Sequence, residues 1–397
     1  MRNRTVLISG ASIAGPALAY WLNRYGFAVT VVEKASALRP GGQAVDFTGE
    51  THHRVLERMG ILAEVYARQT GKTDTVLVDE TGEQVGFISG DFTGGDVEIL
   101  RGDLSHIMYE KTWQSCEYIF GDSITALTET DDAMWVEFER SAPRRFDLVF
   151  GADGIHSRVR RLVFGPEKDF VQHQGHYYCV AGASPWTGTP AGQRERITSY
   201  GHNIAGRYAV SGGSKAQQMY LFASPEIDYA RDDVGAQRRL VKQIFAEVGW
   251  RVPQMLDEMD NFDDFYLDAI AKVRKMKRFT RGRVALLGDA GYGNTLAGFG
   301  TGLAMVGAYV LAGELATAAG DHTVAFARYD NIMRKYAKIS GDANAGRFLC
   351  PKTAWGLKFR NWFLGSKGMD MMMKMAEGSK NLELQDYPSL VGSHPMN

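Results

Sequence analysis

The feature that most constrains the fold is a glycine-rich turn between an apolar strand and a helix near the N-terminus. Residues 5–9 are apolar or β-branched and predict a buried strand, and residues 16–25 predict a helix with Pro16 in its first turn. A second apolar strand is expected at 28–32, with Glu33 at its carboxyl end. Two strands joined by a helix within about 30 residues form a βαβ unit. This part of the chain must therefore enter a parallel sheet that helices cover.

The turn itself has the composition of a dinucleotide site. It reads Gly10-Ala11-Ser12-Ile13-Ala14-Gly15, a G-x-S-x-x-G pattern in which Ser12 replaces the usual middle glycine. Glycines let the backbone approach a pyrophosphate, and the amide groups at the start of a helix attract it. An acid at the end of the second strand accepts hydrogen bonds from ribose hydroxyls, and its charge favours a free diol over a 2′-phosphate. The pattern predicts nucleotide contacts from Gly10, Ser12, Gly15 and Glu33.

Two further glycine motifs each follow a predicted strand. Asp153-Gly154 comes after the apolar segment 146–150 and precedes a serine and two arginines. Gly288-Asp289 comes after the segment 283–287, and a second run of glycines at 298–302 leads into an apolar helix over 302–319. Each motif presents a loop and a helix N-terminus, which suits an anionic group. Taken singly, each is also explained by an ordinary turn or helix cap.

Composition excludes several other classes of protein. The chain has 397 residues, with 45 basic and 46 acidic side chains and a formal net charge of −1, so no nucleic-acid or membrane partner is expected. Its 3 cysteines are widely spaced, which predicts neither disulfides nor a metal site and favours a reducing, cytoplasmic location. The longest apolar stretch, 303–319, is shorter than the roughly 20 residues of a membrane span.

The pattern of elements changes at about residue 171. From there to 276, short aromatic-rich strands separated by turns predict a second domain made mostly of β-sheet. The fold class is therefore α/β (α+β), with a Rossmann-like domain at 1–170 and 277–350, a β-sheet substrate domain at 171–276 and a C-terminal helical segment at 351–397 that packs on the body. Other expected elements are helices at 55–67, 103–112, 234–248, 324–347 and 359–376, a hairpin at 76–88 and strands at 135–139 and 146–150.

In this order and spacing, the three motifs resemble the single-component FAD-dependent aromatic hydroxylases of the para-hydroxybenzoate hydroxylase type, the group A flavin monooxygenases. The stretches 38–46, Leu-Arg-Pro-Gly-Gly-Gln-Ala-Val-Asp, and 306–315, Val-Gly-Ala-Tyr-Val-Leu-Ala-Gly-Glu-Leu, share the resemblance. It covers nearly the whole chain. It is nearest to the branch that contains tetracycline-inactivating monooxygenases and polyketide-tailoring hydroxylases.

The resemblance assigns a role to each motif. It implies an FAD-binding first domain whose ADP moiety contacts the first turn, with the Asp-Gly motif near the pyrophosphate and the nicotinamide cofactor. It also implies that the Gly-Asp motif holds the ribityl chain, that an arginine lies against the flavin, and that the long apolar helix points its positive end at the flavin N1–C2 edge. The residues concerned are Gly10, Ser12, Gly15, Glu33, Arg101, Asp153, Gly154, Gly288, Asp289 and Gly300.

The implied activity is that of a monooxygenase with FAD as cofactor and NADPH or NADH as co-substrate. Such an enzyme hydroxylates an aromatic or polycyclic molecule, polyketide- or antibiotic-like, through a flavin C4a-hydroperoxide. The sequence itself identifies no catalytic residue and no particular substrate, and a monomer or homodimer is expected. Strand residues Tyr200, Arg207, Tyr220 and Phe222 are candidate pocket walls, and strand alternation turns about half of them away from the substrate.

One departure from the family pattern keeps alternatives open. Thr295 and Leu296 stand where the family has a proline that faces the reactive edge of the flavin. The same fold could therefore perform epoxidation, Baeyer–Villiger oxidation or reduction, or bind a flavin or ligand without turnover. A plain nicotinamide dehydrogenase would explain the first turn and Glu33, but not the motifs at 153–154 and 288–289.

Overall fold

The predicted βαβ unit forms the centre of a six-stranded sheet in the order β17-β18-β11-β1-β2-β7. β1 (Thr5–Ser9) pairs in parallel with β2 (Ala28–Glu33) and with β11 (Leu148–Gly151), and α1 (Ala14–Arg24) connects the first two strands. The expected strand–turn–helix–strand order is confirmed. The structure is a computed structural model that describes residues 3–39, 41–70, 74–88, 96–185, 193–198, 204–210, 215–274, 276–296, 300–338, 345–351, 353–364 and 384–387.

This sheet is the middle of three layers, because its strands alternate their side chains between two cores. Val6 and Ile8 of β1 pack against helices α1 and α10, whereas Leu7 packs against a small antiparallel sheet on the other face. α10 has apolar side chains all round and is buried between α1 and α11. The remaining elements of these layers are α10 (Gly300–Thr317), α11 (His322–Ala337), α6 (Arg158–Val163), β7 (Glu117–Phe120), β8 (Ile124–Glu129), β9 (Met134–Phe138), β10 (Arg144–Phe146), β17 (Thr280–Arg281), β18 (Val284–Leu286) and α9 (Asp289–Tyr292).

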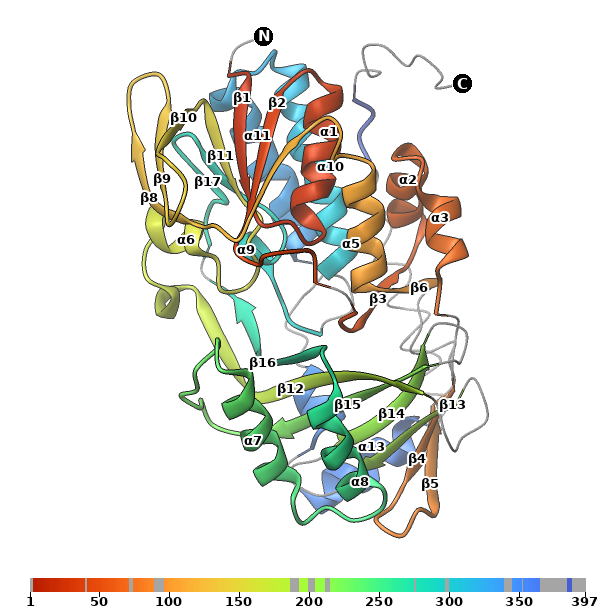
Figure 1. Ribbon diagram of the computed structural model, residues 1–397. Coiled ribbons are helices and arrows are strands. Elements are labelled where there is room, and N and C mark those ends of the chain that lie inside the picture. The colour runs from red at the N-terminus through yellow and green to blue at the C-terminus, as the bar shows by residue number, and fades with distance from the viewer. Residues whose placement is uncertain are drawn as a thin grey trace.

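A seven-stranded sheet forms the other half of the molecule, below the first sheet in Figure 1. Its order is β16-β12-β15-β14-β13-β4-β5, and all described neighbours are antiparallel except β13 and β4. One face is covered by α7 and α8. The elements are β12 (Val171–Pro185), β13 (Gln193–Thr198), β14 (Ile204–Val210), β15 (Lys215–Ala223), β16 (Phe265–Val273), α7 (Val234–Phe245), α8 (Val252–Glu258) and the short η1 (Glu167–Asp169) and η3 (Met259–Asn261).

The predicted hairpin joins this second sheet. β4 (Asp74–Val78) and β5 (Gln84–Ile88) pair with each other, and β4 pairs in parallel with β13. The sheet therefore takes two strands from within 1–170, the range predicted for the first domain, as well as five from 171–276. The domain boundaries themselves stay a prediction.

Two expected elements are divided in the structure, and a third is described only in part. The helix expected at 55–67 is two helices, α2 (Glu50–Arg58) and α3 (Leu62–Ala67), because Gly60 has a φ of 67° between them. The strand expected at 146–150 belongs to β10 and β11 in two different sheets. Of the helix expected at 324–347, the structure describes α11 and α12 (Ala345–Leu349). β3 (Ala44–Phe47), β6 (Val97–Leu100) and α5 (Arg101–Glu110) complete the first half.

The C-terminal segment contacts both halves. α13 (Ala354–Leu364) lies against β5, and the methionine-rich part of the helix expected at 359–376 lies outside the described residues. Residues 384–387 lie on α10, where Tyr387 donates its hydroxyl to Glu314 Oε1 at 3.0 Å and Tyr309 donates to the backbone oxygen of Gln385 at 2.9 Å. We call residues 384–387 the C-terminal strap.

Gly313 of α10 leaves the space into which the strap fits. A Cβ built on Gly313 would lie 2.2 Å from Cδ2 of the Tyr387 ring. Gly313→Ala is therefore expected to displace the strap and to lower the free energy of unfolding by about 2 kcal/mol, as overpacking does. Thermal unfolding of Gly313→Ala, Tyr387→Ala and the double variant measures this. An equal cost of Gly313→Ala with and without the tyrosine ring would contradict the expected contact.

The described residues contain neither a membrane-spanning helix nor a cluster of metal-binding side chains. No helix among the described residues is long and apolar enough to cross a membrane. In the same part of the chain, no group of three or more His, Cys, Asp or Glu side chains is placed to hold a metal ion. Cys116, Cys179 and Cys350 are buried, and all three are free thiols.

Candidate functional site

The turn between β1 and α1 is so tight that neither of its glycines has room for a side chain. Gly10 has a φ of 107°, and a Cβ built on it would lie 2.4 Å from the backbone oxygen of Ala152. A Cβ built on Gly15 would lie 1.9 Å from the backbone oxygen of Gly10. The N–H of Gly10 donates to the backbone oxygen of Val32 at 2.8 Å. The two glycines therefore set the shape of the turn and its closeness to the Asp153 loop.

Helix α1 begins at this turn with amide groups that no described side chain caps. Its first turn contains no acidic residue. Free N–H groups at a helix N-terminus favour an anion. Glu33, at the end of β2, accepts hydrogen bonds from the N–H groups of Ala11 at 2.8 Å and Ala35 at 2.9 Å. Each carboxylate oxygen keeps a further lone pair, so a hydroxyl group beside this turn would find an acceptor.

Arg101 reaches the same turn from the start of α5. Its Nε donates to Ser12 Oγ at 3.1 Å, and Ser105 of the same helix donates its hydroxyl to the backbone oxygen of Ser12 at 2.9 Å. The structure thus brings together two residues that the sequence places 89 positions apart. The guanidinium adds positive charge at the N-terminus of α1.

Asp153 lies beside this turn, but its carboxylate is used within its own loop. It accepts hydrogen bonds from the Ser157 hydroxyl and from the N–H groups of Arg158 at 2.8 Å and Val159 at 3.1 Å. Burial raises the pKa of Asp153, and these hydrogen bonds act against that rise. Gly154 has a φ of 78°, which explains the glycine. These contacts give Asp153 a role in shaping the loop that starts α6, while its contact with a nucleotide stays a prediction.

The Gly288-Asp289 motif lies between α1 and α10. Gly288 has a φ of 60°, and a Cβ built on it would lie 3.2 Å from the Cβ atoms of both Ala14 and Ala304. A Cβ built on Gly300, the first residue of α10, would lie 3.6 Å from Asp289 Oδ1. The predicted residues Asp289 and Gly300 are therefore neighbours.

Asp289 is electrostatically coupled to Arg101. Burial raises the pKa of Asp289, and the charge of Arg101 lowers it. The side chain nevertheless keeps exposed surface. The carboxylate lies beside Gly300, the first residue of α10, and within electrostatic reach of Arg101, the first residue of α5.

The segment that replaces the family proline contacts the second sheet. Thr295 donates its N–H to the backbone oxygen of Ala271 in β16 at 3.0 Å. Leu296 has a φ of 59°, a left-handed conformation that costs a residue with a side chain about 1–2 kcal/mol. Its side chain packs against the apolar cluster of the second sheet that contains Tyr178. The departure from the family pattern thus adds an apolar contact between the two halves.

The loop before β3 is also held by the second sheet. Gly42 donates its N–H to Asp264 Oδ2 at 2.9 Å, and its carbonyl accepts from Gln217 Nε2 at 3.0 Å. On its other side, the N–H of Arg101 donates to the backbone oxygen of Gln43 at 3.1 Å. Side chains of the second sheet therefore fix a loop that contacts the predicted flavin arginine.

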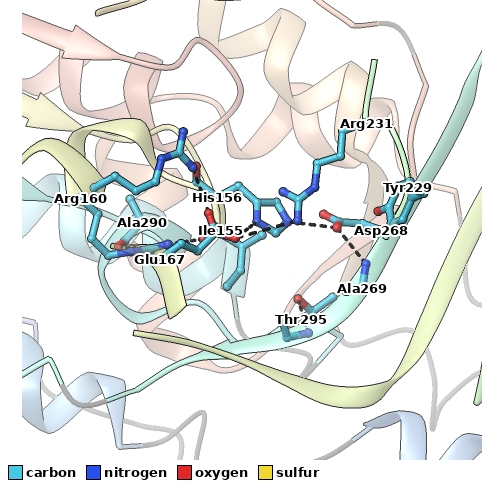
Figure 2. A network of polar contacts seen from close by, with 12 residues as sticks. Ile155, His156, Arg160, Glu167, Tyr229, Arg231, Asp268, Ala269, Ala290 and Thr295 are labelled. Atoms are coloured by element: carbon cyan, nitrogen blue, oxygen red, sulfur yellow. Dashed lines mark hydrogen bonds and ion pairs between the residues drawn. The ribbon is translucent and has the colours of Figure 1, made fainter. Parts of the chain in front are cut away.

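His156 joins the Asp153 loop to the second sheet, as Figure 2 shows. Its Nδ1 lies 2.8 Å from Glu167 Oε1, and its Nε2 lies 3.0 Å from Asp268 Oδ1 in β16. Both ring nitrogens donate, because both partners are carboxylates. Asp268 is buried and also accepts from the Tyr266 hydroxyl at 2.7 Å and from the Ala269 N–H at 2.8 Å.

The two carboxylates control the charge of this histidine. Burial alone would lower the pKa of His156, but the hydrogen bonds to Asp268 and Glu167 raise it above 6.5. Burial would likewise raise the pKa of Glu167, but the hydrogen bond and charge of His156, together with Arg231 and Arg161, lower it from 4.5 to about 2. Burial would raise the pKa of Asp268, but the hydrogen bonds from His156, Tyr266 and Ala269, together with the charge of His156, lower it. The group is therefore an imidazolium between two ionised carboxylates.

Arg160 links the second and third glycine motifs. Its side chain has no exposed surface, and it donates to the backbone oxygen of Ala290 at 2.8 Å and to that of Ile155 at 2.5 Å (Figure 2). A buried guanidinium that satisfies two loop carbonyls keeps these loops in register. The sequence indicated arginines after Asp153-Gly154 but not which loop they reach.

One face of the second sheet is turned away from α7 and α8. On it, Tyr178, Val180 and Leu221 form an apolar cluster with the partly buried Tyr266 and Leu296. Both Arg101 and Asp289 influence the pKa of Tyr178, which burial raises. This face therefore lies beside the residues predicted to hold a flavin.

Two of the candidate pocket walls lie on the face of the second sheet that α7 covers. Tyr220 and Phe222 point to the opposite face of β15, where both rings contact Phe245 of α7. Side chains alternate between the two faces of a sheet, so a shift of one residue along the strand moves a side chain to the opposite face. Tyr200 and the side chain of Arg207 lie outside the described part of the structure.

Comparison with known proteins places this geometry in a class. The chain matches the FAD binding domain family over residues 3–328. It is 39% identical over 347 residues to a flavin-dependent monooxygenase from an unknown prokaryotic organism, covering 85% of this chain and 87% of that protein. It is 43% identical over 335 residues to an uncharacterised protein of Mycobacterium tuberculosis, covering 82% and 88% of the two chains. The crystal structure of tetracycline destructase Tet(55) superposes with a TM-score of 0.79 and 35% identity, covering 98% of this chain and 100% of that one.

The fold and the site thus define a nucleotide-binding protein with a second sheet beside the candidate site, and the chain belongs to the FAD binding domain family. It is a flavin-dependent monooxygenase. The residues present fit FAD as its cofactor. Gly10 and Gly15 have no room for side chains, so the turn presents its backbone at the uncapped start of α1. Arg101 adds positive charge at the same place.

Proposed function

We propose that this monooxygenase uses NADPH or NADH to hydroxylate a polycyclic aromatic or enolic small molecule of the tetracycline or polyketide kind. The observation that carries the proposal is the apolar, tyrosine-bearing face of the second sheet beside Arg101 and Asp289. A flat apolar substrate suits such a face, with a small number of polar groups to orient it. The similarity to a tetracycline destructase supports the same substrate class.

The chain would hold FAD by the residues of its three glycine motifs. The turn from Gly10 to Gly15 would bind the pyrophosphate, and Glu33 would accept from the adenosine ribose. Asp289 would accept from a ribityl hydroxyl, with Arg101 between it and the pyrophosphate. The helix dipole of α10, which starts at Gly300, would stabilise negative charge on the flavin.

Bound FAD, reduced by the nicotinamide cofactor, supplies the activation of dioxygen. The protein's own part is to exclude water and to position the substrate. The apolar cluster of Tyr178, Val180, Leu221 and Leu296 excludes water from the side of the second sheet. The Gly42 loop, fixed by Asp264 and Gln217, ties that sheet to the flavin residues.

The proposal is tested with the purified, FAD-loaded protein. NADPH and NADH consumption is measured with and without tetracycline and 2-naphthol, and the products are weighed by mass spectrometry. Substrate-stimulated consumption with a product heavier by one oxygen atom is the expected result. A yellow protein whose consumption no such compound stimulates would contradict the proposed substrate class. Oxygen uptake with an unchanged ring substrate would instead favour reduction without hydroxylation.

A further inference from the structure

The edge strand β16 presents three polar side chains to the first half of the molecule at alternate positions. Asp264, which directly precedes the strand, accepts from the Gly42 N–H, and Asp268 accepts from His156. Tyr266 lies between them and therefore on the same side of the strand. The two aspartates are each engaged with a loop of the first half, and the tyrosine stands in the interval between those loops.

Tyr266 is surrounded by groups of the flavin region. The guanidinium of Arg39 lies 5.2 Å above its ring, and the ring of Tyr178 is 5.7 Å away. Leu296 packs against the same cluster. Tyr266 keeps some exposed surface, whereas Tyr178 is 4% exposed. Of Tyr178 and Tyr266, Tyr266 has the more exposed surface, so a bound molecule reaches it more readily.

The hydroxyl group of Tyr266 has a fixed direction. It donates to Asp268 Oδ2 at 2.7 Å. Asp268 remains an acceptor, because its other oxygen receives hydrogen bonds from His156 Nε2 and from the Ala269 N–H. Burial raises the pKa of Tyr266 well above its usual value, and the neighbouring Tyr178 and Asp268 raise it further, so the phenol stays neutral. A neutral phenol has one hydrogen to donate, and here that hydrogen is committed to Asp268.

It follows that Tyr266 Oη offers only lone pairs to anything else that approaches it. An acceptor of this kind favours a ligand O–H or N–H group and disfavours a ligand carbonyl or ether oxygen at the same place. A buried polar group without a partner loses more free energy than one hydrogen bond contributes. The preference for a donor ligand over an acceptor ligand is therefore larger than the free energy of a single hydrogen bond.

We propose that Tyr266 recognises a hydroxyl group of the substrate by accepting its hydrogen bond, and that Asp268 and His156 fix this polarity as positioning residues. The inference rests on the proposed function and deepens it. The preferred substrate carries an un-ionised phenolic or enolic O–H where it meets β16, next to the apolar cluster that holds its rings.

The test compares two probes of similar size that differ in polarity. 2-Naphthol has an O–H donor, whereas 2-acetonaphthone has only a carbonyl acceptor. Binding of each to the FAD-loaded protein is measured by titration calorimetry near neutral pH without NADPH, so that no turnover occurs. The wild-type protein is expected to bind 2-naphthol about tenfold more tightly than 2-acetonaphthone. Absence of a preference, or no binding of 2-naphthol, overturns the proposal.

Tyr266→Phe removes the acceptor and is expected to reduce the preference to within about twofold. Tyr220→Phe is the matched control, because it makes the same chemical change on the opposite face of the sheet, against α7. It should keep the wild-type preference. A Tyr266→Phe variant that keeps the preference would overturn the assignment.

Asp268→Asn gives a readout that a merely structural role would not produce. The Ala269 N–H requires an oxygen at the position of Oδ1, so the new amide N–H₂ must face Tyr266. Tyr266 then accepts from the amide, and its own hydrogen turns toward the ligand. Binding of 2-acetonaphthone should become about tenfold tighter than in the wild type, while 2-naphthol gains nothing. Unchanged or weaker binding of both probes would show that Asp268 does not set the polarity.

These outcomes separate the inference from the proposed function. A protein that consumes no NADPH with any polycyclic phenol, yet shows the Tyr266-dependent preference, contradicts the proposed reaction and leaves the recognition intact. A protein that hydroxylates such phenols without the preference contradicts only the role of Tyr266.

Discussion

Gly15→Ala is expected to give a folded protein that does not retain FAD. The new Cβ would lie 1.9 Å from the backbone oxygen of Gly10. No side chain can rotate to relieve this contact, because both partners belong to the backbone of the turn. The turn must open, and its amide groups then lose their common direction toward the pyrophosphate. We expect FAD affinity to fall by about 100-fold, measured as the flavin-to-protein absorbance ratio after desalting and by titration of the apoprotein.

Gly26→Ala is the matched control for this variant. Gly26 follows α1 with a φ of 84°, and a Cβ built there would meet nothing within 4 Å. The control therefore costs only the strain of a side chain in a left-handed conformation, about 1–2 kcal/mol of stability. It should retain FAD. Retention of FAD by Gly15→Ala, at the level of this control, would show that the cofactor does not lie on the turn and would remove Gly10, Ser12 and Gly15 from the site.

The first sheet could be predicted because its signals are local. The strand, the glycine turn, the helix and Glu33 follow one another between residues 5 and 33, and each carries its own propensity and spacing. The contact of Glu33 with Ala11 follows from the βαβ geometry alone, since parallel neighbours end at the same edge of the sheet. Ser12 and Arg101 could be assigned together only through the family resemblance, because one lies in the turn before α1 and the other is the first residue of α5.

The contribution of the second sheet could not be predicted, because it depends on register and on distant pairing. Gly42 and Asp264 are separated by 222 positions, and His156 and Asp268 by 112. Nothing local marks Asp264 or Asp268 as partners of those loops. A shift of one position in β15 also decides whether Leu221 or its neighbours Tyr220 and Phe222 face the flavin region.

Leu296 shows a second feature that could not be predicted from the sequence. The sequence indicated that a family proline was missing, so flavin reactions other than hydroxylation remained alternatives. In the structure, the position is filled by a left-handed leucine that packs against the apolar cluster of the second sheet. Leu296 keeps this strained backbone conformation only because the packing around it holds it in place. Those surroundings are tertiary, so a single sequence cannot reveal them.

His156→Gln is expected to destabilise the protein most strongly in mildly acidic solution. The imidazolium lies between Glu167 and Asp268, so its removal leaves two carboxylates facing each other around a neutral amide. Removing one member of a buried charged pair costs about 3 kcal/mol. The free energy of unfolding, from urea titrations at a series of pH values, measures the loss. His106→Gln is the matched control: His106 pairs with Glu110 on the exposed surface of α5, where such a pair contributes less than about 1 kcal/mol.

The pH dependence follows from the directions of the pKa shifts. The pKa of His156 is raised above 6.5 in the folded protein, so its stabilisation is complete below pH 6.5 and is lost as the pH rises through the folded value. The pKa of Glu167 is lowered from 4.5 to about 2, so its stabilisation is complete above pH 4.5 and is lost as the pH falls toward 2. The three-membered group is thus most stabilising between pH 4.5 and pH 6.5.

The difference between wild type and His156→Gln should therefore be greatest in that window and should shrink as the pH rises through the folded pKa of His156, because the wild-type imidazole then loses its charge. The shrinkage arises from a falling wild-type stability and not from a recovering variant, because glutamine does not titrate. A difference that stays constant from pH 5.5 to about pH 9 would mean that His156 acts by packing alone. In that case Asp268 would not be held ionised by a neighbouring positive charge, and the fixed direction of the Tyr266 hydroxyl would depend only on the Ala269 N–H.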